Sequence, residues 1–259
     1  MCAAVVLIAP LVSAQDAGKR LEESPRHQEW VAIQSGQRTV SAYLAFPEAA
    51  GKTLSVVVIH ENRGLTDWVR SVADQLAEAG YVAIAPDLLS GMAPGGGKTS
   101  DFPSGDAARE AISKLSPDQV TSDLNAVTDY AVRLPAASGK AAVAGFCWGG
   151  MQTFRFATNR PDLAAAFVFY GTGPQEEAAI ARIRSPVHGF YGGSDARVNA
   201  TVPEISERMK RLGKTFEPVV YEGAGHGFLR AGEEPDATES NKRARAEAWK
   251  RWKELLKKL

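Results

Sequence analysis

The chain has 259 residues, of which 44% are hydrophobic and 23% are charged, as in an ordinary globular protein with room for one substantial core. Its 30 basic and 30 acidic residues cancel, and neither sign forms a long block. Nucleic-acid-binding proteins normally concentrate basic residues on one surface, so we expect no nucleic-acid partner.

The chain begins with an apolar segment. Residues 1–14 resemble the apolar core of a secretory signal peptide, with Val12-Ser13-Ala14 as a cleavage site, although no basic residue precedes the apolar run. The segment is too short to cross a bilayer. The sequence therefore predicts a periplasmic or secreted protein with no membrane partner after cleavage. The alternatives are an apolar tail packed on the domain and a cytoplasmic protein.

The rest of the chain alternates predicted strands with predicted helices. Residues 30–34 and 38–46 predict a hairpin around Ser35-Gly36-Gln37. Further strands are predicted from apolar runs at 56–59, 81–85, 141–145, 165–170, 187–191 and 218–221. Helical spacing predicts helices at 66–79, 117–134 (with Ser116 as N-cap), 151–158, 174–184, 203–212 and 236–259.

Residues 91–105 contain five glycines and two prolines, which predicts an irregular loop. The alternation elsewhere is typical of an α/β fold, with a mostly parallel sheet covered by helices on both faces. Neither a repeat nor a linker divides the sequence, so we expect a single domain over residues 15–259.

The most informative motif is Gly145-Phe146-Cys147-Trp148-Gly149-Gly150, which joins a predicted strand to a predicted helix. A G-x-C-x-G turn in this position is typical of a nucleophile elbow, here with cysteine in place of the more usual serine. The glycines suit a turn too sharp for side chains beside the nucleophile, and the helix N-terminus favours a thiolate. Alone, the motif is equally compatible with a glycine-rich turn around a buried cysteine.

Two further groups follow predicted strands. Asp195 comes after strand 187–191, and His226 lies on a glycine-rich turn after strand 218–221. Ligands and catalysts collect at the carboxyl ends of parallel strands, and the order Cys147, Asp195, His226 is that of an α/β-hydrolase triad. We expect His226 to accept the thiol proton and Asp195 to orient the imidazole. The Trp148 N–H would donate to the oxyanion.

The segment His60-Glu61-Asn62-Arg63-Gly64 also follows a predicted strand. In an α/β-hydrolase the equivalent loop supplies the second oxyanion N–H, which makes the Asn62 backbone the candidate. Glu61 would lie close to the elbow and hold the thiol protonated until substrate arrives; the alternative is a solvated loop acid. Gly95-Gly96-Gly97-Lys98-Thr99-Ser100 lacks the spacing of a phosphate-binding loop, and no histidine and cysteine cluster suggests a metal, so neither cofactor nor metal is expected.

These motifs resemble the dienelactone hydrolases (carboxymethylenebutenolidases) over roughly residues 28–259, an α/β-hydrolase family. The resemblance implies a triad of Cys147, Asp195 and His226. It makes Glu61 the acid that first pairs with the cysteine and later helps to activate it. It also places Arg230 at the position of an arginine for the substrate carboxylate. The family's second such arginine would fall near Gly91, where this sequence has none.

We therefore expect a hydrolase of small esters or lactones that acts through a thioester acyl-enzyme, with a monomer favoured. The missing arginine and the predicted signal peptide favour one alternative, a broad carboxylesterase for phenolic or polymer esters. A non-catalytic binding protein on the same scaffold is the alternative from another class.

Overall fold

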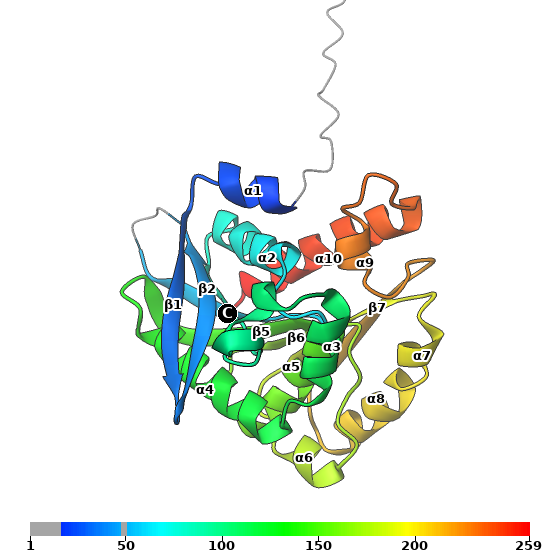
Figure 1. Ribbon diagram of the computed structural model, residues 1–259. Coiled ribbons are helices and arrows are strands. Elements are labelled where there is room, and N and C mark those ends of the chain that lie inside the picture. The colour runs from blue at the N-terminus through cyan, green and yellow to red at the C-terminus, as the bar shows by residue number, and fades with distance from the viewer. Residues whose placement is uncertain (1–16, 48–50) are drawn as a thin grey trace, which may run out of the picture.

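The computed structural model describes residues 17–47 and 51–259, which form a central sheet flanked by helices (Figure 1). The predicted signal peptide lies outside the described residues, and the prediction of export is not tested. Within the described residues, no helix is both long and apolar enough to cross a membrane.

The sheet has eight strands, as expected of an α/β-hydrolase. They are β1 (His27–Ser35), β2 (Arg38–Phe46), β3 (Thr53–Ile59), β4 (Val82–Pro86), β5 (Ala137–Phe146), β6 (Ala166–Phe169), β7 (Val187–Gly192) and β8 (Phe216–Tyr221). Their order across the sheet is β1-β2-β4-β3-β5-β6-β7-β8. β2 pairs antiparallel with both β1 and β4, and the pairs from β4 to β8 are all parallel. The carboxyl ends of β3, β5, β6, β7 and β8 therefore share one edge.

The helices are α1 (Ala17–Glu23), α2 (Asp67–Glu78), α3 (Gly105–Ser113), α4 (Pro117–Arg133), α5 (Trp148–Asn159), α6 (Glu177–Ala181), α7 (Ala196–Asn199), α8 (Val202–Arg211), α9 (Phe228–Ala231) and α10 (Glu239–Leu256). Two 3-10 turns, η1 (Pro94–Gly96) and η2 (Thr99–Asp101), precede α3. Figure 1 shows α1, α2 and α10 above the sheet and α4, α6 and α8 below it. The alternation predicted from sequence is confirmed.

The sheet divides the core into two apolar layers. One contains α2, α10 and the aromatic side chains of β5 and β6, and the other contains α4, α5 and α8. Trp252 of α10 is fully buried, and its ring centroid lies 6.2 Å from that of Phe146 and 4.9 Å from that of Phe169. The terminal helix thus packs directly against the strand that leads to Cys147.

Two expectations about local structure need correction, and a third, the N-cap of α4, is confirmed in its position. The predicted loop 91–105 contains two 3-10 turns, and α3 begins at its end because Ser104 Oγ caps the helix by accepting from Ala107 N at 3.2 Å. The predicted helix 174–184 is reduced to α6. Ser116 occupies the N-cap position of α4, but its side chain accepts no capping hydrogen bond. The short helices α1, α7 and α9 have too few residues to show periodicity in the sequence.

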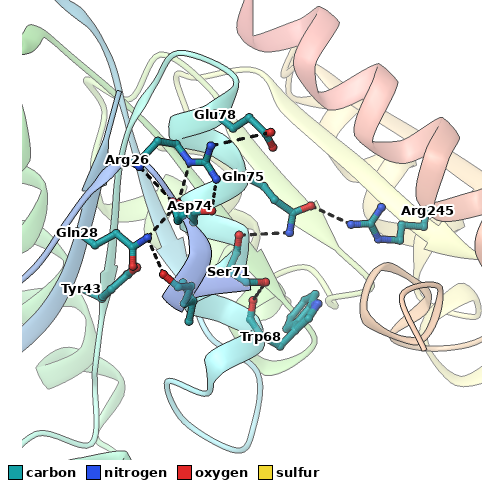
Figure 2. A network of polar contacts seen from close by, with 11 residues as sticks. Arg26, Gln28, Tyr43, Trp68, Ser71, Asp74, Gln75, Glu78 and Arg245 are labelled. Atoms are coloured by element: carbon teal, nitrogen blue, oxygen red, sulfur yellow. Dashed lines mark hydrogen bonds and ion pairs between the residues drawn. The ribbon is translucent and has the colours of Figure 1, made fainter. Parts of the chain in front are cut away.

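A polar network anchors the segment before β1 to α2 (Figure 2). Asp74 is fully buried, and its carboxylate accepts from Arg26 Nε at 2.8 Å and from Arg26 Nη2 at 2.6 Å. Tyr43 Oη donates to Gln28 Oε1 at 2.5 Å on the same side. Farther along α2, Gln75 Oε1 accepts from Arg245 Nη2 of α10 at 2.8 Å. A buried carboxylate needs such partners, so the network ties the first described residues to the body of the fold.

Candidate active site

Cys147 lies on a sharp turn between β5 and α5. Its backbone has φ 56° and ψ −113°, a conformation that side-chain-bearing residues rarely adopt. A Cβ on Gly149 would lie 2.3 Å from the backbone oxygen of His60, and one on Gly145 would lie 2.2 Å from the backbone oxygen of Gly149. Both positions therefore require glycine, as the motif predicted, and the turn lifts the half-buried Cys147 above the sheet edge.

Asp195 and His226 come together from the ends of β7 and β8. His226 Nδ1 lies 2.5 Å from Asp195 Oδ2, and the other carboxylate oxygen accepts from Val198 N at 3.3 Å. The two loops are joined because Ser194 N donates to Ala224 O at 2.9 Å. The carboxylate is thus held from two sides, and its imidazole partner is oriented with Nε2 free to face another group.

That other group is the side chain of Cys147. A hydrogen bond with Cys147 is the largest cause that raises the pKa of His226 from 6.5 to about 9; burial opposes this, and the hydrogen bond with Asp195 adds to it. An imidazole with such a pKa is protonated at neutral pH, which suits an ion pair with a thiolate. The structure therefore brings together all three residues predicted for a triad.

The loop after β3 packs against the elbow. His60 is fully buried; its Nδ1 donates to Glu61 O at 2.7 Å, and its ring stacks on that of Trp148 with centroids 5.4 Å apart. Burial lowers the pKa of His60, so the ring is neutral. Asn62 follows in this loop, and the Trp148 N–H is among the first N–H groups of α5, which have no partner within a helix. The two predicted oxyanion donors thus lie on adjoining segments.

Glu61 pairs with Arg230 of α9. Arg230 Nε donates to Glu61 Oε2 at 3.0 Å, while the arginine side chain is 40% exposed and the glutamate 11%. Burial lowers the pKa of Arg230, but the charge of Glu61 and this hydrogen bond outweigh that effect and raise it. The glutamate lies near the elbow as expected, with the arginine as its hydrogen-bond partner.

Tyr170 is a site residue that the sequence did not single out. It follows β6 directly, has φ 42°, and its ring meets that of His226 edge-on with centroids 5.1 Å apart. Its buried hydroxyl has no hydrogen-bond partner among the described residues. Burial first, and then the charges of Glu61 and Cys147, raise its pKa, so the phenol stays protonated. Its strand-end position is the signal that could have identified it.

The region around Gly91 contributes no second arginine. Lys98, the nearest cation in the following turns, lies over the ring of Trp30 with Nζ 3.6 Å from the centroid. Thr99 holds these turns in place because its N and Oγ1 donate to Asp87 at 2.9 and 2.7 Å. Across the described residues, no group of three or more His, Cys, Asp or Glu side chains is arranged to hold a metal ion.

Comparisons with known proteins show what the chain is similar to. A family model described as "Dienelactone hydrolase family" matches residues 40–259. Two relatives carry the name "Putative carboxymethylenebutenolidase". The one from Methylorubrum extorquens is 31% identical over 76% of this chain and 70% of its own length. The one from Saccharolobus solfataricus is 30% identical over 85% of this chain and 94% of its own length.

Solved structures show the same fold. A crystal structure described as "Putative Dienelactone Hydrolase" from Klebsiella pneumoniae superposes with a TM-score of 0.78 at 27% identity, covering 90% of this chain and 99% of that one. An acylaminoacyl peptidase from Pyrococcus horikoshii superposes with a TM-score of 0.67 over 90% of this chain and 41% of that one; at 15% identity it shows the fold alone.

Proposed function

The chain belongs to the dienelactone hydrolase family and is a carboxylic ester hydrolase, and we propose that it cleaves small esters or lactones by nucleophilic attack of Cys147. One observation carries this proposal: His226 is hydrogen-bonded to the carboxylate of Asp195, and the side chain of Cys147 is the largest cause of its raised pKa. A histidine in this position can take a proton from the nucleophile and return it to the leaving group.

The reaction follows from these contacts. The thiolate of Cys147 attacks the carbonyl carbon, and the N–H groups of Trp148 and Asn62 stabilise the oxyanion. As the C–O bond breaks, protonated His226 gives its proton to the leaving oxygen, which leaves a thioester on the sulfur. Water then attacks the thioester carbonyl carbon while His226 accepts a proton from that water, and the C–S bond breaks. The carboxylic acid departs and the Cys147 thiolate is restored beside protonated His226. Asp195 keeps the imidazole oriented and stabilises its cation.

The ion pair of Glu61 and Arg230 can couple binding of the substrate to activation of Cys147. The side chain of Arg230 is 40% exposed, so a substrate carboxylate can reach it. A second carboxylate on Arg230 weakens its hold on Glu61, which is then free to turn toward Cys147. A glutamate released in this way can accept the proton from any Cys147 that is still a thiol, which adds to the thiolate that pairs with His226.

A broad-specificity carboxylesterase, for phenolic or polymer esters, is the second candidate. The observation that favours it is the absence of a guanidinium at Gly91, together with the engagement of Lys98 by Trp30. A single arginine that is already paired binds a substrate carboxylate less firmly than two would. Neutral esters do not need that contact.

The test is single-turnover reaction with a small aryl ester and with cis-dienelactone, followed by mass spectrometry of the protein. Both candidates predict an acyl adduct on Cys147 and no turnover by Cys147→Ala. Faster acylation by the lactone, reduced by Arg230→Ala, supports the dienelactone assignment, and faster acylation by the aryl ester supports the broad esterase. A folded protein that forms no adduct with either would refute the hydrolase and leave a non-catalytic binding protein.

A further inference from the structure

His60 is a buried histidine that the proposed reaction does not use. Both of its ring nitrogens contact the backbone, with Nδ1 2.7 Å from Glu61 O and Nε2 3.4 Å from Leu88 N. A carbonyl oxygen can only accept a hydrogen bond, and an amide N–H can only donate one. The ring of His60 therefore carries its proton on Nδ1 and is neutral, in agreement with a pKa that burial lowers.

The contact with Nδ1 fixes the direction of one peptide group. No described peptide bond is cis, so the C=O of Glu61 and the N–H of Asn62 point in opposite directions across a planar group. Because the carbonyl faces the imidazole, the Asn62 N–H faces away from it. Within the described residues Asn62 N donates no hydrogen bond, which leaves this N–H available to a ligand.

The same histidine also contacts the elbow. Its ring is stacked on that of Trp148, with centroids 5.4 Å apart and an interplanar angle of 13°. The backbones are close as well, since a Cβ on Gly149 would lie 2.3 Å from His60 O. The two predicted oxyanion donors, the N–H groups of Asn62 and Trp148, thus belong to segments that His60 holds together.

A second hydrogen bond keeps the loop folded in the absence of the imidazole. Gly64 N donates to Glu61 O at 3.3 Å and closes a turn over residues 61–64. This bond lies within the loop, so it preserves the shape of the turn without fixing its orientation to the elbow. If the imidazole contact is lost, the turn can tilt as a unit, and the Asn62 N–H then no longer points at the carbonyl oxygen of a bound ester.

We propose that His60 is a positioning residue for the oxyanion hole, whose Nδ1–H holds the Glu61–Asn62 peptide so that the Asn62 N–H points at the oxyanion. The inference rests on the proposed attack by Cys147. His60 takes no part in proton transfer, because backbone groups occupy both of its nitrogens. The negative charge on oxygen develops only as the thiolate attacks, so the effect of His60 belongs in kcat and hardly in KM.

Two variants separate the two ring contacts. His60→Asn places an amide nitrogen where Nδ1 lies, so it can still donate to Glu61 O, but it leaves Leu88 N without an acceptor. His60→Gln places its amide where Nε2 lies, so it can still accept from Leu88 N, but it gives Glu61 O no donor. With 4-nitrophenyl acetate, His60→Gln should lower kcat about 100-fold at nearly unchanged KM. His60→Asn should keep most of the activity, even though it loses the contact with Leu88.

Alkylation of Cys147 by iodoacetamide is the control, because displacement of iodide by the thiolate forms no oxyanion. Its rate should be similar in the wild type and in both variants. Three results would overturn the positioning role: a kcat of His60→Gln equal to that of the wild type, a larger loss in His60→Asn than in His60→Gln, or alkylation that slows as much as hydrolysis.

Nitrogen NMR of the wild type tests the same contact without a substitution. The chain has four histidines, so the His60 ring can be assigned. Its Nδ1 should be protonated and its Nε2 unprotonated at neutral pH, and the opposite tautomer would overturn the proposal. Wild-type turnover that requires Cys147 would show that the proposed hydrolase survives such a result. A wild type without any turnover would remove both proposals.

Discussion

The strained turn at Cys147 predicts that glycine stabilises the protein relative to alanine at this position, the opposite of the usual effect of glycine. At φ 56° and ψ −113°, a residue with a Cβ is expected to cost about 1–3 kcal/mol. Replacing alanine by glycine normally costs about 0.4–1 kcal/mol through the unfolded chain. Cys147→Gly should therefore be more stable than Cys147→Ala by about 1 kcal/mol, or about 2–4 °C in Tm for a domain of this size. Both variants lack the sulfur, so loss of the contact with His226 cancels.

Differential scanning calorimetry of the two variants at one scan rate measures this difference. Ala246→Gly, at an exposed position in α10, provides the control and should lower Tm, since glycine inside a helix costs about 0.5–1 kcal/mol. A Cys147→Gly variant that melts at or below the temperature of Cys147→Ala would show that the turn stores no strain.

Three further predictions concern the core, the histidine and the elbow. Trp252→Ala should reduce the free energy of unfolding by about 3–5 kcal/mol in urea titrations. The control is Trp30→Ala, which should reduce it far less because Trp30 is 40% exposed. Equal losses would contradict the buried position of Trp252. Folding raises the pKa of His226 from 6.5 to about 9, so its contribution to stability is complete below about pH 6.5 and is lost as the pH rises through about 9. In urea titrations from about pH 6.5 to about pH 9, the free energy of unfolding should fall less for Cys147→Ala than for the wild type. Identical pH profiles would contradict the contact between His226 and Cys147. Gly149→Ala places a Cβ 2.3 and 2.4 Å from two backbone oxygens at the end of β3. The variant should lose about 1–3 kcal/mol of unfolding free energy, and its kcat/KM should fall because the oxyanion loop is displaced. Full activity would refute that close approach.

The fold and the three central site residues were accessible from sequence for one physical reason. Parallel strands end at a common edge, so the residues that follow β5, β7 and β8 had to approach one another once those strands were identified. Local patterns define such strands, and the glycines of the elbow are dictated by contacts within a few residues and with the neighbouring strand.

Contacts that depend on side-chain packing could not be predicted in this way. The bond between Glu61 and Arg230 joins residues 169 positions apart, and no local pattern indicates which partner the glutamate has. In the sequence, nothing distinguishes Tyr170 from other aromatic residues at strand ends. Its φ of 42° and its contact with the ring of His226 are seen only in the structure. The helix α3 was missed because glycines and prolines just before it dominated the composition of the segment.

The position of α10 has a consequence for biosynthesis. Trp252 packs against the aromatic rings of β5 and β6, yet it is translated long after them. A nascent chain that has completed α9 already contains Cys147, Asp195 and His226, but its apolar layer lacks the helix that covers it. Such a chain exposes phenylalanine side chains to which a chaperone can bind. Its active site does not yet have its final arrangement. We expect hydrolytic activity to emerge on the ribosome only when α10 has left the exit tunnel and docked, which makes turnover a reporter of the final step of folding.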